Sequence, residues 1–120
     1  MDTRSKILTL DSALALPRGQ VTIAAGYFDA LTAAHTRELA ALARPVLAVV
    51  LPLAAELVPR RARAEMVAAL RVIDYVVIAE PKDVETLAGR LEPRALAHFE
   101  AADEARVSQL IEHVRSRQSR

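Results

Sequence analysis

The side chains best suited to chemistry lie together in the stretch 26–35. An apolar run ends at Gly26, a turn with two aromatic residues and an aspartate follows, and a helical pattern begins near Thr32 with His35 in its first turn. A glycine between a strand and a helix start leaves unpaired backbone N–H groups that bind anions. His35 can donate to a phosphate there; the simpler alternative is a capping-turn histidine without a ligand. The stretch therefore predicts an anion site.

The stretch 26–35 needs a strand before it and a helix after it. Residues 21–25 are apolar almost throughout, which is typical of a strand buried on both faces. Two further apolar runs, 46–51 and 75–78, predict a second and a third strand. Helical patterns separate the runs, and this alternation indicates a parallel sheet with right-handed crossovers. Ligands bind at the carboxyl ends of strands in such sheets, and the stretch 26–35 is one of these ends.

The helix between the second and third strands is expected to start with Pro59 at its first position. Its core-facing residues, taken from helical spacing, are Ala62, Met66, Ala69 and Leu70. The residues expected on its outer face or in its first turn are Arg60, Arg61, Arg63 and Glu65. The arginines form either a solvated helix start or a phosphate site, because positive charge is unfavourable at a helix N-terminus without an anion.

After the third strand, the sequence predicts only helices. Asp83 is expected to cap a helix over 83–91, a short helix follows at 95–102, and a longer one covers 104–114. The apolar face of the last helix packs on the sheet or contacts a partner, so a homodimer is one alternative.

The two ends of the chain are expected to lie outside the domain that spans 21–115. Residues 1–20 form an N-terminal arm, either with a short helix from Ser12 capped by Asp11 or loosely packed. Residues 116–120 form a polar tail.

Composition limits the classes of function. A chain of 120 residues with 52% apolar and 26% charged residues predicts one globular domain. A net charge of +1 argues against a nucleic-acid partner. Cysteine is absent, and His35, His98 and His113 are too dispersed for a metal site. The chain starts without a signal-like segment, and its most apolar run, 46–57, is too short to span a bilayer, so we expect a cytoplasmic protein without a membrane partner.

Two blocks of sequence together resemble a known family. The first is Gly26-Tyr27-Phe28-Asp29-x-Leu31-Thr32-x-x-His35, and the second runs from Arg63-Ala64-Glu65 to the strand Tyr75-Val76-Val77. Both are similar to the cytidylyltransferase-like nucleotidyltransferases, and the lead-in at 6–10 is similar to that of the adenylyltransferase domain of bacterial ADP-heptose synthases. The blocks stand in the family's order and cover roughly residues 6–80.

The resemblance implies a Rossmann-like three-layer α/β/α fold, with a parallel sheet of three or more strands and a helical C-terminal part. It also implies transfer of AMP or CMP from a nucleoside triphosphate, with Mg²⁺, to a phosphorylated sugar or alcohol, with release of pyrophosphate. His35 and Thr32 match motif positions that contact the triphosphate. The other residues that the resemblance assigns to nucleotide binding are Gly26, Tyr27, Phe28, Asp29, Ala34, Arg63 and Ser108.

The chain also departs from the family pattern. Ala34 replaces a glycine that lets the nucleotide lie close to the helix start. The loop before the Arg63 helix has no lysine, and the later strands of the family are not recognisable. These departures keep two alternatives open: a degenerate, inactive relative that serves in binding or protein interaction, and a plain α/β binding domain whose motif match is coincidental.

Overall fold

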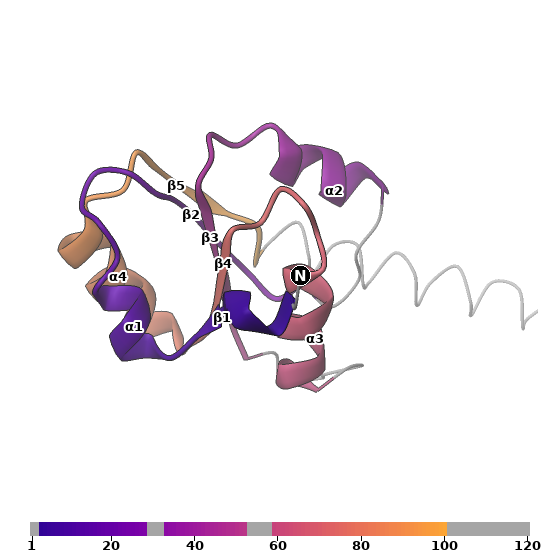
Figure 1. Ribbon diagram of the computed structural model, residues 1–120, viewed down its shortest axis with the longest axis horizontal. Coiled ribbons are helices and arrows are strands. Elements are labelled where there is room, and N and C mark those ends of the chain that lie inside the picture. The colour runs from indigo at the N-terminus through magenta and orange to yellow at the C-terminus, as the bar shows by residue number, and fades with distance from the viewer. Residues whose placement is uncertain (1–2, 29–32, 53–58, 101–120) are drawn as a thin grey trace, which may run out of the picture.

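Five parallel strands form one sheet at the centre of the protein (Figure 1). The structure is a computed structural model that describes residues 3–28, 33–52 and 59–100. The strands are β1 (Ile7–Leu8), β2 (Thr22–Gly26), β3 (Val46–Val50), β4 (Tyr75–Ile78) and β5 (Ala95–His98). They lie in the order β1-β4-β3-β2-β5. The predicted α/β fold with a parallel sheet and the three predicted strands are confirmed.

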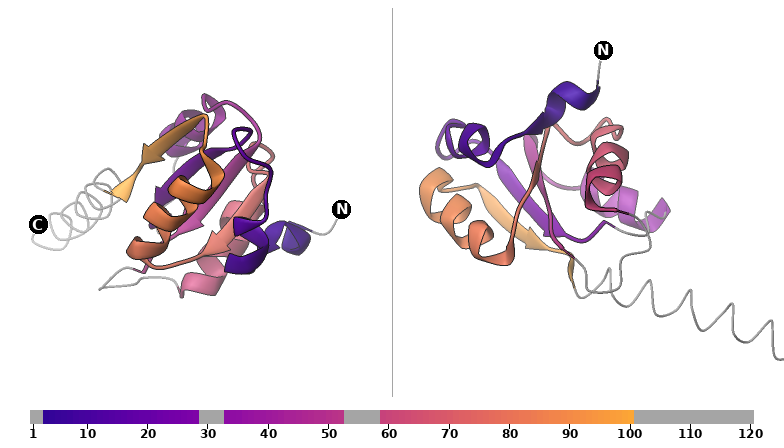
Figure 2. Two further views of the ribbon diagram at one scale, coloured as in Figure 1. Left: turned by 90° about the vertical axis from the view of Figure 1, so that its left-hand side faces the viewer. Right: turned by 90° about the horizontal axis from the view of Figure 1, so that it is seen from below.

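Helices pack against the sheet through two separate apolar clusters. Residues from α1 (Leu10–Leu14) and α4 (Pro81–Leu91) share one cluster, and residues from α2 (Ala33–Ala40) and α3 (Arg60–Ala68) share the other. Successive residues of β3 alternate between the clusters, since side chains of a strand point to opposite faces. Figure 2 shows the two pairs of helices on opposite sides of the strands.

Strand β5 corrects the expectation that only helices follow Asp83. Residues 95–98, which we expected to begin a short helix, pair in parallel with β2 from Thr22 to Ala25. Backbone hydrogen bonds fix both ends of the pairing, from Arg94 N–H to Val21 O and from Phe99 N–H to Ala25 O, both at 2.8 Å. The segment carries two alanines and no β-branched residue, so its strand conformation comes from pairing with β2 rather than from local propensity.

The start of the chain contributes a strand and a helix. Strand β1 pairs with β4 through Ile7 and Leu8. The following helix α1 begins two residues earlier than expected, because Thr9, not Asp11, is its N-cap and accepts from Ser12 N–H at 3.2 Å. Ala13 of this helix is fully buried. The region predicted as an arm thus contributes to the sheet and to the core.

Helix α3 faces the core with residues that differ from those expected. Its buried residues are Arg63, Ala64, Val67 and Ala68. Met66, expected in the core, is 42% exposed. The helix is therefore rotated relative to the prediction, and an arginine occupies the inner face.

Helix α4 begins earlier than predicted, at Pro81. Glu80 is its N-cap, and Asp83 is the third residue of a capping box in which Glu80 N–H donates to Asp83 Oδ2 at 2.9 Å. The predicted helix 104–114 and the tail lie outside the described residues. Within the residues that the structure describes, no helix is long and apolar enough to span a membrane.

Candidate functional site

The predicted anion site begins at the carboxyl end of β2, an inner strand that lies next to the edge strand β5. Gly26 ends this strand, is buried, and accepts a hydrogen bond through its carbonyl from Leu51 N–H at 2.9 Å. β3 pairs with one edge of β2 and β5 with the other. From β2 the chain passes through α2 to β3 and then on to β4, so these strands are added on one side of β2. After α4 the chain adds β5 on the other side of β2. The direction in which strands are added therefore reverses at β2. In open parallel sheets ligands bind outside the carboxyl ends of the strands where the order reverses.

Two phenylalanines close one face of this strand end. Phe28 follows β2 and Phe99 follows β5; the two residues are 0% and 8% exposed, and their ring centroids lie 6.5 Å apart. Phe28 has a φ of 53°, in the left-handed region that bulky residues rarely adopt. Burial of the ring compensates for a backbone cost of about 1–3 kcal/mol. Phe28 thus shapes the turn by filling the core beneath it.

Arg63 connects the carboxyl ends of β2 and β3 from inside the protein. Its side chain is fully buried, and its Nη1 donates to Tyr27 O at 2.6 Å and to Leu51 O at 2.9 Å. Both carbonyls lie just beyond the last residue pair of β2 and β3, Gly26 and Val50. A guanidinium presents several donors in a fixed plane, which suits such a link. The predicted nucleotide-binding arginine therefore holds the floor of the candidate site.

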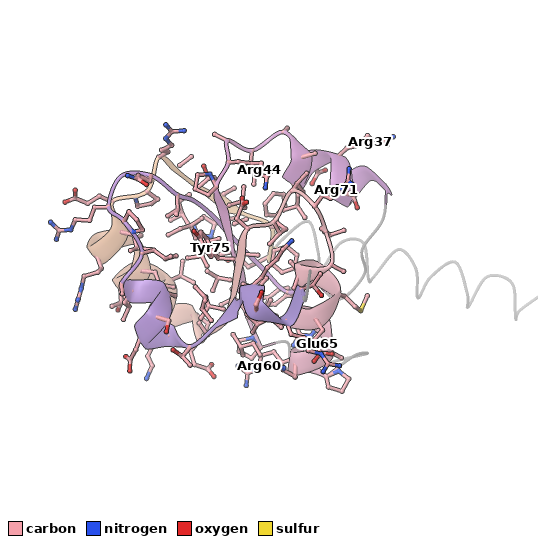
Figure 3. All side chains as sticks on the ribbon, viewed as in Figure 1. Arg37, Arg44, Arg60, Glu65, Arg71 and Tyr75 are labelled. Carbon is pink, nitrogen blue, oxygen red and sulfur yellow. The ribbon has the colours of Figure 1, made fainter. Side chains whose placement is uncertain are left out.

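The other two arginines at the start of α3 form ion pairs. Arg60 lies 3.1 Å from Glu80 at the start of α4, and Arg61 lies 3.5 Å from Glu65 one turn along α3. Figure 3 shows Arg60 and Glu65 together at one end of the molecule. The Arg60–Glu80 pair links two helix starts across the carboxyl end of the sheet. The positive charges that suggested a phosphate site from sequence are thus offset by neighbouring carboxylates.

The remaining predicted site residues are only partly described. Tyr27 is half-buried and packs against the cluster shared by α1 and α4. Ala34 and His35 lie in the first turn of α2, and their side chains lie outside what the structure describes. The positions assigned to Asp29, Thr32 and Ser108 fall outside the described residues. The structure therefore brings Gly26, Tyr27, Phe28 and Arg63 to one place and leaves the positions of the others untested.

Two residues of this region were missed from the sequence. Phe99 was missed because β5 was not expected, and Glu80 because Asp83, three residues later, was predicted to be the cap of this helix. The dipeptide Glu80-Pro81, followed by an aspartate two residues on, is a capping-box pattern that could have indicated the earlier start. Phe99, one of only two phenylalanines in the chain, carried no comparable signal.

His98 is on β5 rather than in a helix. Its side chain is exposed, and its Nδ1 lies 3.1 Å from Glu100 Oε1. In residues 3–28, 33–52 and 59–100, no group of three histidine, aspartate or glutamate side chains is arranged to hold a metal ion. His113, the last of the three histidines, lies outside the described residues.

No protein-family model matches the chain, and no curated protein matches it significantly. The resemblance described above therefore rests on the residues themselves, in particular on the two blocks that contain Gly26 to His35 and Arg63 to Val77.

Proposed function

We propose that the chain is a nucleotidyltransferase, which transfers AMP or CMP from a nucleoside triphosphate to a phosphorylated sugar or alcohol. The observation that carries the proposal is the location of Gly26 at the end of β2, where the strand order reverses between β3 and β5. The sequence block that resembles the family motif starts at this point. The proposal includes the finer fold assignment, a Rossmann-like three-layer α/β/α domain with a helical C-terminal part.

The proposed reaction needs no protein nucleophile. A phosphate oxygen of the acceptor attacks the α-phosphorus of the nucleotide, a new P–O bond forms, and the bond to the leaving pyrophosphate breaks. His35 and Thr32 are proposed to hydrogen-bond the phosphates as negative charge moves onto the leaving group. Unpaired N–H groups at the start of α2 would add to this stabilisation. Arg63 is assigned the role of holding the turn, because its guanidinium is buried against backbone carbonyls.

Mg²⁺ is proposed to arrive with the triphosphate. The described residues offer no cluster of carboxylates that fits a resident ion. We therefore assign Mg²⁺ to the oxygens of the nucleotide itself and derive no step through a protein-bound metal. The proposed partners are thus a nucleotide and a phosphorylated small molecule, in a cytoplasmic protein without nucleic-acid or membrane partners.

A pyrophosphate-release assay tests the proposed activity directly. The chain is incubated with ATP or CTP, Mg²⁺ and a panel of sugar phosphates, and release is compared with that of the His35→Ala variant. Release that depends on one acceptor and is lost in the variant supports the proposal. No release with any pair, together with no heat of binding for either nucleotide at millimolar concentration, rules out the active enzyme.

The second candidate is an inactive relative that keeps the fold. Two observations favour it: Ala34 adds a methyl group at the position of the motif glycine, and Arg63 is committed to the backbone. The Ala34→Gly variant separates the candidates by isothermal titration with ATP and CTP. Ala40→Gly is a matched control, since it places a glycine at an exposed site of the same helix and costs a similar ~1 kcal/mol of helix stability.

Binding that appears only in the Ala34→Gly variant means that the site is blocked in the natural chain, which supports the inactive relative. Binding by the unchanged chain, equal in the Ala40→Gly variant, supports the transferase.

A further inference from the structure

A cavity of about 370 Å³ lies at the amino end of the sheet, away from the candidate site. We call it the amino-end cavity. Its lining residues are Lys6, Arg44, Arg71, Ile73, Asp74 and Tyr75. They precede or begin strands β1, β3 and β4, whereas Gly26 ends a strand. Figure 3 shows Arg44 and Arg71 at the end of the molecule opposite Arg60. The volume falls within the ~300–1,000 Å³ range of small-molecule sites.

Among the described residues that line this cavity, Asp74 supplies the one carboxylate, and the protein engages both of its oxygens. Arg44 donates to both oxygens of Asp74, from Nη2 to Oδ1 at 2.6 Å and from Nε to Oδ2 at 3.3 Å. Val46 N–H donates to Oδ2 at 2.8 Å. The charge of Asp74 is therefore offset by Arg44. Lys6 is also attracted to Asp74 electrostatically, whereas Arg71 has no carboxylate partner among the residues that the structure describes. With three cations and one carboxylate, the lining carries two positive charges in excess.

Lys6 is held in position while keeping donors available. Its Nζ donates to Leu70 O, just beyond the end of α3, at 3.2 Å. An ammonium group has three donors, so two remain for a ligand. The carbonyl also comes from the residue before Arg71, and this bond therefore holds Lys6 next to the turn that carries Arg71.

Arg71, unlike Lys6, is not held in position by a hydrogen bond of its side chain within the described part of the chain. Its side chain is exposed, and within the described part of the chain it makes no hydrogen bond or ion pair. A cation near the end of α3 is favourable to the helix dipole, but Lys6 already donates to the carbonyl of Leu70 in the turn that follows α3. Like charges on one small cavity repel each other, and a bound anion removes that repulsion.

We propose that the amino-end cavity binds the phosphate group of a small phosphate ester. The two charges in excess match a phosphate dianion, and guanidinium and ammonium groups form short, charge-assisted hydrogen bonds to phosphate oxygens. The half-buried Tyr75 supplies apolar surface for the carbon skeleton of the ester. This site is separate from the proposed nucleotide site and does not depend on nucleotide binding.

The test is a titration of the full-length, ¹⁵N-labelled chain by NMR. The probes are glycerol 3-phosphate and inorganic phosphate, each compared with sodium chloride at the same ionic strength. We expect saturable shifts of the amides of Lys6 and 71–75 with both probes. Equal affinity indicates a site for the phosphate group alone, and tighter binding of glycerol 3-phosphate indicates a site for the ester; both results support the proposal.

Variants test whether the binding is specific. Arg71→Gln is expected to weaken binding by about tenfold or more, since it removes a charge-assisted hydrogen bond. Arg90→Gln is the matched control, because Arg90 is also an exposed arginine near the end of a helix but lies in α4. Thermal unfolding of both variants checks that they keep the fold.

Three results would overturn the proposal. The first is a set of shifts that sodium chloride reproduces. The second is saturable binding whose shifts are confined to the amides of 26–28, at the other end of the sheet. The third is equal weakening by Arg71→Gln and Arg90→Gln, which would indicate a general response to charge.

Discussion

Arg63 provides the sharpest test of how the floor of the candidate site is held. The substitution Arg63→Met keeps an apolar chain in the core and removes the guanidinium. It leaves the carbonyls of Tyr27 and Leu51 without the donor that lies 2.6 and 2.9 Å from them. The free energy of unfolding should therefore fall.

The expected loss is large for a domain of this size. Each hydrogen bond from a charged group contributes about 1.5–3 kcal/mol, so two contribute about 3–6 kcal/mol. Removing a buried charge also recovers its desolvation cost, which sets the expected loss at the lower end, about 3 kcal/mol. Single domains have about 5–15 kcal/mol of stability in total, so the variant should unfold at a clearly lower urea concentration.

Urea unfolding followed by circular dichroism measures this loss, since the chain has no tryptophan. Arg61→Met is the matched control, because Arg61 is on the same helix, is 60% exposed and only pairs with Glu65 at 3.5 Å. Its effect should stay within about 0.5 kcal/mol. If the two variants lose equal stability, Arg63 does not hold the strand ends together, and its buried position needs another explanation.

Two further predictions concern opposite ends of the sheet. Partial burial favours the neutral form of Asp74, but hydrogen bonds from Arg44 and from backbone N–H, together with nearby positive charge, outweigh it and lower the pKa of Asp74 below its ordinary 3.8. The stabilisation is therefore present above pH 3.8 and is lost as the pH falls through the lowered pKa, so the stability difference between the chain and Asp74→Asn should shrink on acidification. Phe28→Ala and Phe99→Ala should each cost about 3–5 kcal/mol, and the double variant should cost less than the sum by about 0.5–1.5 kcal/mol.

Urea unfolding across a pH series checks the first of these, and a double-mutant cycle at neutral pH checks the second. A stability difference for Asp74→Asn that stays constant with pH would contradict the role of its charge. Strict additivity of the two phenylalanine variants would contradict direct packing of their rings.

The central part of the fold could be predicted because its sequence signals are local. The runs 46–51 and 75–78 are apolar without interruption, and Thr22 is the one polar residue of the run 21–25, a pattern typical of strands buried on both faces. The glycine after the first run correctly marked its carboxyl end. β5 escaped prediction because its alanines carry no strand signal, and its conformation comes from pairing with β2, a contact between distant parts of the chain.

The candidate site was harder to predict than the sheet. Arg63 was expected outside because charged residues rarely enter a core, yet two strand-end carbonyls needed a donor and α3 supplied it. Such a need is visible only once the strand ends are placed in space. The same holds for the amino-end cavity, whose cations come from Lys6, Arg44 and Arg71, far apart in sequence and adjacent only after folding.

The location of nucleotide binding tests the central claim most directly. We would titrate ¹⁵N-labelled chain with Mg²⁺-ATP and with Mg²⁺-CTP and map the amide shifts. We expect saturable changes at Gly26, Phe28, His35 and Phe99, around the strand ends where the order of the sheet reverses. No saturable change at millimolar nucleotide, or changes confined to Lys6 and Arg71 at the opposite end, would contradict it.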